Sequence, residues 1–244
     1  TSRLAAALSR ERLPFVVKGV TDESSGGGFD VVLCRTTEDV RKAMTLFQSL
    51  SQVVVEEFIP ILRNLCLNYA VNAAGTITYL GCAEQVVDEQ GRYLGNWIGM
   101  GIEAPAQAIA IGDAIVREGC KRGYLGFVGM DMAVMEHGKV LVFDLNFRLN
   151  GSTATLVLAE SLQARLGQPL FRLRRLTGTG TYQEMLKAIL KAMDQGLVWP
   201  LHSYDPLAGG TPKGRPCFSA LIPGKDEEGV QGCMDKLAGL GIVP

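Results

Sequence analysis

Two aspartates interrupt apolar runs in the segment GMDMAVMEHGKVLVFDLNFRLNGST, residues 129–153. Asp131 lies in the first run, Asp144 lies in the second, and residues 136–139 join the two runs. If His137-Gly138 forms a two-residue hairpin loop, the aspartates are cross-strand partners whose β-carbons lie about 4.5–5.5 Å apart. Like charges in such a position destabilise a sheet, so the pair indicates a chemical role.

The residues after Asp144 extend this chemistry. Because side chains alternate between the two faces of a strand, Asn146 and Arg148 are expected on the face of Asp144. Two carboxylates and an amide oxygen form an all-oxygen site, which suits Mg²⁺ or Mn²⁺. The alternative is that one aspartate is a surface residue near the turn and that the pairing is shifted by one residue. A cation that relieves the repulsion is the simplest reason to keep both charges.

A candidate anion site lies near the start of the chain. Lys18 ends an apolar strand, and the loop after it contains the small residues Ser24, Ser25, Gly26, Gly27 and Gly28. Small residues let backbone N–H groups approach an anion closely, and the lysine adds positive charge. Taken alone, such a loop is most often only flexible, and the chain has no Walker A sequence. Glu56 and Glu57 end a further strand, where acids are usually just solvated.

Strands and helices alternate in the elements that must position these residues. A helix is expected to begin at Thr36 or Thr37, where a hydroxyl can cap it. Two alternating runs meet at Ala73-Ala74-Gly75 and predict a hairpin. Residues 168–181 are interpreted as a connection and 199–216 as a loop. The remaining predicted helices are 3–11, 105–123, 152–166, 182–195 and 226–239, and the remaining strands are 13–18, 29–34, 52–58 and 217–223.

Composition excludes several classes of function. Hydrophobic residues make up 47% of the 244 residues and the net charge is -1 with a pI near 6.1, so no basic surface for nucleic acid is expected. The apolar runs are too short for a membrane span. The 6 cysteines show no CxxC spacing and are expected to be reduced thiols of a cytoplasmic protein.

Five segments, taken in order, resemble the ATP-grasp superfamily: PFVVK, the Gly/Ser loop, VVVEEFI, GFVGMDMAV and VFDLNFRLNGST. The resemblance covers about residues 13–160 and is nearest to the peptide ligases of the pheganomycin type. It implies an α/β (α+β) fold in which two mixed or antiparallel sheets with helices clamp the nucleotide, plus a C-terminal α/β extension. The implied domains are a small Gly-loop subdomain (1–50), a metal-binding and catalytic subdomain (51–166) and the extension (167–244).

The resemblance also implies a role for each matching residue. Lys18 would contact the phosphates of ATP, and the loop from Ser24 to Gly28 would close over them. Residues Glu56, Glu57, Phe58 and Ile59 would hold the adenine, and Asp131, Asp144 and Asn146 would bind magnesium. Arg148 would face the reacting carboxyl phosphate. Asn150, Gly151 and Ser152 lead into a helix N-terminus that would hold a substrate carboxylate.

The implied activity is an ATP-dependent carboxylate–amine ligase that makes an amide through an acyl phosphate. Its substrates would be small molecules such as amino acids or peptides; their identity, the oligomeric state and the role of residues 167–244 stay open. The alternatives are a non-catalytic ATP-binding module and an ATP-grasp carboxylase or phosphotransferase.

Two departures from the family pattern matter. A second, upstream phosphate-binding lysine is missing, which predicts that an N-terminal domain is absent and that the chain alone is less active. Arg63 and Asn64 occupy the usual place of the ribose-binding acid, for which Glu57 could substitute.

Overall fold

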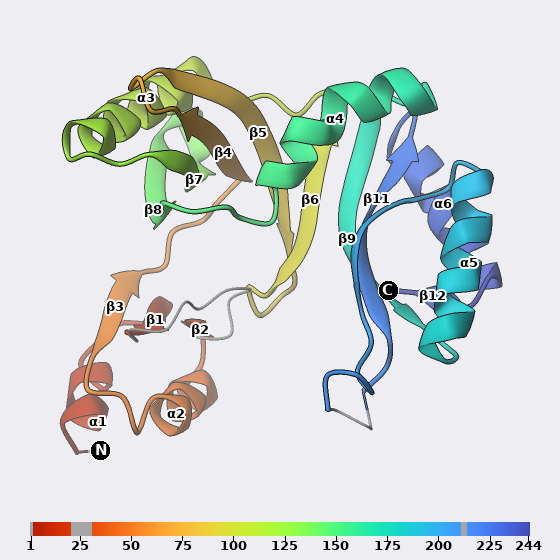
Figure 1. The fold of residues 1–244 in the computed structure, drawn as a ribbon. Coiled ribbons are helices and arrows are strands. Elements are labelled where there is room, and N and C mark those ends of the chain that lie inside the picture. Colours follow the sequence, from red (N-terminus) through yellow and green to blue (C-terminus); the bar gives the residue numbers. More distant parts are fainter. Residues whose placement is uncertain (1, 21–30, 211–213) are drawn as a thin grey trace. The chain divides into compact units, whose positions relative to one another are not determined.

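The computed structural model describes residues 2–20, 31–210 and 214–244. The chain forms two compact units (Figure 1): unit 1 comprises residues 1–60 and 87–93, and unit 2 comprises residues 61–86 and 94–244. Within the described ranges, no helix has both the length and the apolar character that a membrane span requires.

These boundaries differ from the divisions expected at residues 50 and 166. Residues 51–60 belong to unit 1 because β3 (Val53–Glu57) pairs with β1 (Phe15–Gly19). The predicted extension 167–244 belongs to unit 2 because β9 (Leu170–Gly178) pairs with β6 (Tyr93–Gly99) in one continuous sheet.

Unit 1 contains an antiparallel sheet with the strand order β2–β1–β3, where β2 is Val31–Cys34. Helices α1 (Ser2–Leu8) and α2 (Thr37–Leu46) share one core with this sheet. Thr36 caps α2 as predicted: its hydroxyl accepts from the N–H of Asp39, and the Asp39 carboxylate accepts from the N–H of Thr36. The buried core residues are Leu8, Phe15, Val17, Cys34, Ala43 and Phe47.

The described part of unit 2 is built on one nine-stranded sheet. Its order is β10–β11–β9–β6–β5–β4–β7–β8, and β12 pairs with β9 beside this path. Strand β4 lies between β5 and β7, so the predicted hairpin β4–β5 and the aspartate-bearing hairpin β7–β8 are neighbours. The bounds are β4 Arg63–Val71, β5 Ile77–Val87, β7 Gly126–Val134, β8 Val140–Asn146, β10 Trp199–Tyr204, β11 Cys217–Gly224 and β12 Ile242–Val243.

Helices cover both faces of this sheet. They are α3 (Ala106–Lys121), α4 (Thr153–Leu166), α5 (Tyr182–Asp194) and α6 (Glu227–Gly239). In β5, Cys82 packs into the cluster of α3 and Ala83 into that of α4. In β9, Leu173 packs with α4, whereas Leu176 packs with α5 and α6. Because neighbouring side chains alternate, α4 lies on one face, and α3, α5 and α6 lie on the other.

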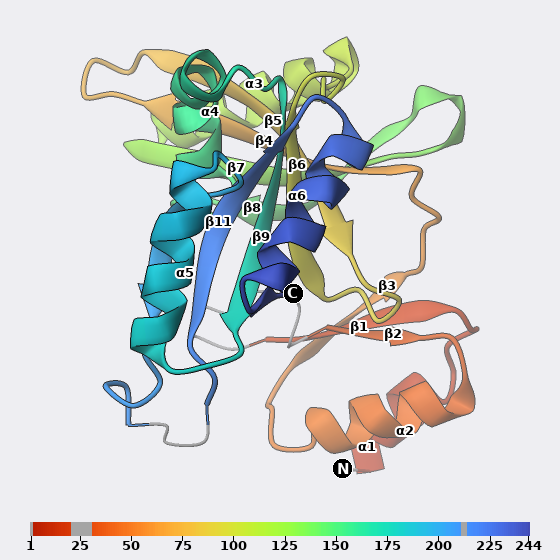
Figure 2. The same ribbon diagram turned by 90° about the vertical axis from the view of Figure 1, so that its right-hand side faces the viewer.

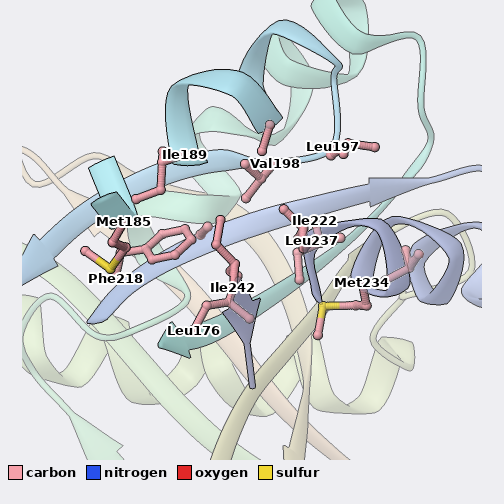
Figure 3. Packing of buried hydrophobic residues seen from close by; sticks show 13 residues of the cluster. Leu176, Met185, Ile189, Leu197, Val198, Phe218, Ile222, Met234, Leu237 and Ile242 are labelled. Carbon is pink, nitrogen blue, oxygen red and sulfur yellow. The ribbon is translucent and has the colours of Figure 1, made fainter. Parts of the chain in front are cut away.

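Figure 2 shows α5 and α6 lying along β9 and β11. Figure 3 shows the side chains that fill the space between them, among them Leu176, Phe218 and Ile222 from the strands. This core stabilises the end of the sheet farthest from the two aspartates, since β7 and β8 end the strand order at the opposite side.

The prediction that residues 168–181 form a connection is wrong, because they contain the central strand β9. Three arginines interrupt its apolar pattern, yet Arg172 is only 6% exposed. Its guanidinium donates to the carbonyls of Leu173 at 2.8 Å and Leu94 at 3.0 Å, and it lies over the Trp97 ring. The predicted loop 199–216 also begins with a strand, β10.

Candidate functional site

The aspartate pair is present: Asp131 of β7 and Asp144 of β8 are cross-strand partners. The loop that joins the strands differs from the predicted two-residue loop. It spans residues 136–138 and is closed by a 2.8 Å hydrogen bond from the N–H of Met135 to the carbonyl of Lys139. The longer loop shifts the register by one residue, and a β-bulge between Asp131 and Met132 shifts it back.

The strand register gathers polar residues on the α4 face of the sheet. One row across β5, β4, β7 and β8 contains Ala83, Cys66, Asp131 and Asp144. The next row contains Gly81, Asn68, Gly129 and Asn146. The opposite face of β4 and β7 carries the buried apolar core beneath α3. The same strands therefore carry an apolar core on one face and a polar surface on the other. This surface, formed by Cys66, Asn68, Asp131, Asp144 and Asn146, is called the polar floor.

Asp131 is partly buried, whereas Asp144 is exposed. Burial raises the pKa of the Asp131 carboxyl above its ordinary value, and the nearby Asp144 carboxylate raises it further. Gln85, on β5, donates from Nε2 to Oδ1 of Asp131 at 2.7 Å. Cys66, the β4 partner of Asp131, is a neutral thiol because burial raises its pKa.

Asp144 and Asn146 are oriented by their own contacts. The carboxylate of Asp144 accepts from the N–H of Leu145 at 3.0 Å and from Nδ2 of Asn146 at 2.9 Å. Because the amide nitrogen of Asn146 donates to Asp144, its amide oxygen is the atom left to bind a cation. Arg148 follows the end of β8, is exposed, and donates from Nη1 to the carbonyl of Leu149 at 3.1 Å.

A buried polar network fixes the turn into α4. Oδ1 of Asn150 accepts from the N–H groups of Ser152 at 3.0 Å and Thr153 at 3.1 Å, and from the hydroxyl of Ser152. The fully buried Asn68 donates to the hydroxyl of Ser152 and accepts from that of Thr153. Ser152 is only 2% exposed, so its side chain stabilises the turn. The residues predicted to hold a substrate carboxylate, Asn150, Gly151 and Ser152, form this turn.

The same turn lies directly on the polar floor. A β-carbon on Gly129 would overlap the amide nitrogen of Asn150, so only glycine leaves room for Asn150 at this point of β7. The nitrogen of Asn150 also donates to the sulfur of Cys66 at 3.5 Å. The start of α4 therefore contacts Gly129 and Cys66, the cross-strand partners of Asn146 and Asp131.

In unit 1, two predicted nucleotide-binding residues form an ion pair: Nζ of Lys18 lies 2.7 Å from the carboxylate of Glu56. Glu57 is exposed at the end of β3, and Ile59 is partly buried. The guanidinium of Arg35 lies 5.6 Å from the centre of the Phe58 ring. The predicted phosphate loop, Ser24, Ser25, Gly26, Gly27 and Gly28, lies outside the described residues.

The donor set of unit 2 fits a hard divalent cation. Among the described residues, no group of three or more His, Cys, Asp or Glu side chains is arranged to hold a metal ion. Asp131, Asp144 and Asn146 instead offer two carboxylates and one amide oxygen, which is the donor type that Mg²⁺ and Mn²⁺ prefer. The opposed carboxylates repel each other unless a positive charge lies between them. Arg148 and the N-terminus of α4 add positive potential close by.

Sequence reasoning missed Gln85, Cys66 and Asn68 as parts of this site. Gln85 and Asn68 belong to the predicted hairpin, whose own register says nothing about β7. Only the pairing of β4 with β7, two strands about 60 residues apart in sequence, brings them to the aspartates. No local pattern in the sequence encodes that pairing.

Comparison with known proteins identifies a family and several similar folds. Residues 1–146 match a family model described as L-aspartate–L-methionine ligase, ATP grasp. The carboxyaminoimidazole ribonucleotide synthase of Aspergillus clavatus, solved with ATP, superposes with a TM-score of 0.65 at 14% identity. The N5-carboxyaminoimidazole ribonucleotide synthetase of Thermus thermophilus gives 0.64 at 14%. Each alignment covers 98% of this chain and 65% of the other, so the chain spans less than two thirds of their length.

A more distant similarity is to the biotin carboxylase domain of the 2-oxoglutarate carboxylase of Hydrogenobacter thermophilus, solved with MgADP and bicarbonate. Its TM-score is 0.56 at 14% identity, over 91% of this chain and 55% of that one. At these identities the comparisons establish a shared fold, with mixed α/β architecture and antiparallel sheets, as the sequence predicted.

Proposed function

The chain belongs to the L-aspartate–L-methionine ligase family of ATP-grasp proteins, and from this membership we propose that it carries the ATP site of a carboxylate–amine ligase. The observation that supports the proposal best is the opposed pair Asp131–Asp144, with Asn146 in the next row and the N-terminal turn of α4 beside it. A metal-binding floor next to an anion-attracting helix start is what phosphoryl transfer to a carboxylate requires.

The reaction would proceed in two steps. A carboxylate oxygen of the first substrate takes the γ-phosphoryl group of ATP, the bond to ADP breaks, and an acyl phosphate forms. The nitrogen of the amine then attacks the acyl carbon, phosphate leaves, and the nitrogen loses one proton to give the amide. Both steps depend mainly on alignment and charge neutralisation, so no protein nucleophile is needed.

The polar floor would serve the first step. Asp131, Asp144 and Asn146 would hold Mg²⁺, which when bound neutralises phosphate charge. Gln85 and the backbone N–H of Leu145 hold the two carboxylates in place through hydrogen bonds of 2.7 and 3.0 Å. In unit 1, we assign Lys18 and the loop Ser24–Gly28 to the phosphates, and Glu56 to Ile59 to the adenine.

Arg148 and the turn at Asn150–Ser152 would serve the acyl group. Arg148 is exposed and carries a permanent positive charge, so it can stabilise the oxyanion that forms on the acyl carbon. The turn is rigid because Asn68 and Asn150 satisfy its hydroxyls and first N–H groups. A substrate carboxylate would therefore meet a fixed positive potential at the start of α4.

Substitution of the two aspartates tests the proposal. Asp131→Asn and Asp144→Asn keep the shape of the side chain and remove its charge, and Asp194→Asn, at the exposed end of α5, is the matched control. We expect Mg²⁺-dependent ADP binding and turnover to fall by about two orders of magnitude or more in the first two variants only. Unchanged Mg²⁺-dependent binding in both would refute the assignment of the metal site.

The product distinguishes a ligase from other ATP-grasp enzymes. Because the family description names L-aspartate and L-methionine, these are the first pair to supply with ATP, followed by other amino acids and peptides. Amide product together with ADP, detected by mass spectrometry, supports the proposal. ADP release that depends on bicarbonate, with a carboxylated product, would identify a carboxylase instead.

A further inference from the structure

We propose that Gln85 is a positioning residue that selects which oxygen of Asp131 binds the metal. This inference rests on the proposed function, since it concerns the same floor of unit 2. It assigns a role to a residue on a third strand, outside the two strands that carry the metal-binding residues.

Gln85 and Asp131 are hydrogen-bonded although their strands are not neighbours in the sheet. Gln85 lies on β5 and Asp131 on β7, with β4 between them, yet Nε2 of Gln85 lies 2.7 Å from Oδ1 of Asp131. The glutamine side chain therefore reaches across a whole strand. A donor–carboxylate bond of this length is charge-assisted and about twice as strong as a bond between neutral groups.

The strand adjacent to Gln85 also carries a buried amide oxygen, that of Asn64. Leu65 of β4 pairs with Glu84 of β5, so by the same register Asn64 stands beside Gln85. The Oδ1 atom of Asn64 is buried and accepts no hydrogen bond from the described residues. Gln85 donates to the more distant, charged carboxylate of Asp131, and the Asn64 amide oxygen on the adjacent strand accepts no hydrogen bond from it.

The Gln85 side chain is a neutral amide, which orients the carboxylate of Asp131 by a hydrogen bond alone. Oδ1 of Asp131 accepts from Gln85 and the Cys66 thiol contacts the same carboxylate, so Oδ2 is the oxygen without an amide donor. A neutral amide holds the carboxylate without adding a competing charge, whereas Glu84, its neighbour in sequence, is paired with Arg63 at 2.8 Å. Without the Gln85 bond the Asp131 carboxylate could rotate. Metal binding would then have to restrict this rotation, which would weaken the metal affinity. Partners of this type typically contribute about 10- to 100-fold to metal affinity.

Magnesium-linked ADP binding provides a test that does not depend on turnover. The dissociation constant for ADP is measured by calorimetry in EDTA and across a series of Mg²⁺ concentrations, which gives the concentration at half effect. Gln85→Met removes the donor at similar length, and Gln85→Asn keeps the amide but withdraws it by one methylene group. Gln163→Met, on the exposed surface of α4, is the control, and Asp131→Asn is the positive reference.

We expect Gln85→Met to raise the Mg²⁺ concentration at half effect about 10- to 100-fold, with a smaller rise for Gln85→Asn and none for Gln163→Met. ADP binding in EDTA should stay unchanged, and the melting temperature of the metal-free protein should fall by only a few degrees, because the Asp131 carboxylate loses one donor. A value within twofold of the parent in both Gln85 variants would overturn the inference, as would loss of ADP binding in EDTA, which indicates a purely structural role. If Mg²⁺ does not affect ADP binding in the parent protein, the proposed function itself fails.

Discussion

Gly129→Ala should destabilise unit 2 through one identifiable contact. Gly129 lies on β7 opposite Asn146, and an added β-carbon would overlap the amide nitrogen of Asn150. Asn150 cannot move aside freely, because its Oδ1 accepts from the N–H groups of Ser152 and Thr153 and from the Ser152 hydroxyl at the start of α4. The new methyl group must therefore displace either the turn or the strand.

The expected cost follows from these contacts. Loss of the Asn150 cap would reduce stability by about 1 kcal/mol, and overpacking in a filled space adds about 1–3 kcal/mol. Alanine restricts the unfolded chain and returns about 0.4–1 kcal/mol. We therefore expect the free energy of unfolding to fall by about 1–3.5 kcal/mol. Because Asn150 lies beside the polar floor, ADP binding in the presence of Mg²⁺ should weaken as well.

Urea unfolding of four proteins measures this effect: the parent, Gly129→Ala, Asn150→Ala and the double variant. Removal of the Asn150 amide leaves space for the methyl group, so Gly129→Ala should cost less than about 0.5 kcal/mol in that background. Gly232→Ala is the control, because no atom lies within 4 Å of the added carbon and α6 gains about 0.5–1 kcal/mol from alanine. Equal costs of Gly129→Ala in both backgrounds would refute the contact as the cause.

Three further outcomes are expected. Arg172→Met should lower the free energy of unfolding by about 2–4 kcal/mol, because two carbonyls lose their donor; a cost below about 0.5 kcal/mol in urea unfolding would contradict this. Thr36→Ala should destabilise α2 by about 1 kcal/mol through the lost capping box, which helical circular dichroism during unfolding will detect. Burial raises the pKa of Cys82 from 9.0 to about 11, so the folded state retains a proton that the unfolded chain releases. Stability should therefore fall as the pH rises from about 9 to 11, by up to about 1.4 kcal/mol per pH unit, and urea unfolding of Cys82→Ala should show a shallower decline.

Elements encoded by local signals were predictable from the sequence. The cap at Thr36, the turn at residues 73–75 and the helix after Pro105 all occur where the pattern places them. In each of these cases, the residues that determine the structure lie close together in the sequence. Strand β9 was missed for the opposite reason, since Arg172 finds its partners on β6 and its own strand only after the sheet has formed.

The candidate site was only partly predictable, for a related reason. Asp131, Asp144 and Asn146 lie on one hairpin, so a local register brings them together. Gln85 and Asn68 reach them through β4, whose pairing with β7 depends on how the whole sheet assembles. Long-range strand pairing leaves no periodic signal in a single sequence.

The bulge in β8 explains how one short strand serves both the core and the site. Before the bulge, Val142 pairs with Met132 and faces the apolar cluster under α3; after it, Asp144 pairs with Asp131 on the opposite face. Positions 142 and 144 would share a face in a regular strand, because side chains alternate with a period of two. The extra residue, Phe143, is therefore what allows the valine to pack partly buried against the core and the aspartate to be exposed. The predicted two-residue loop lacked both the third loop residue and this bulge. The loop residue shifts the register by one and the bulge shifts it back, so the two errors cancelled and the predicted pair Asp131–Asp144 was correct.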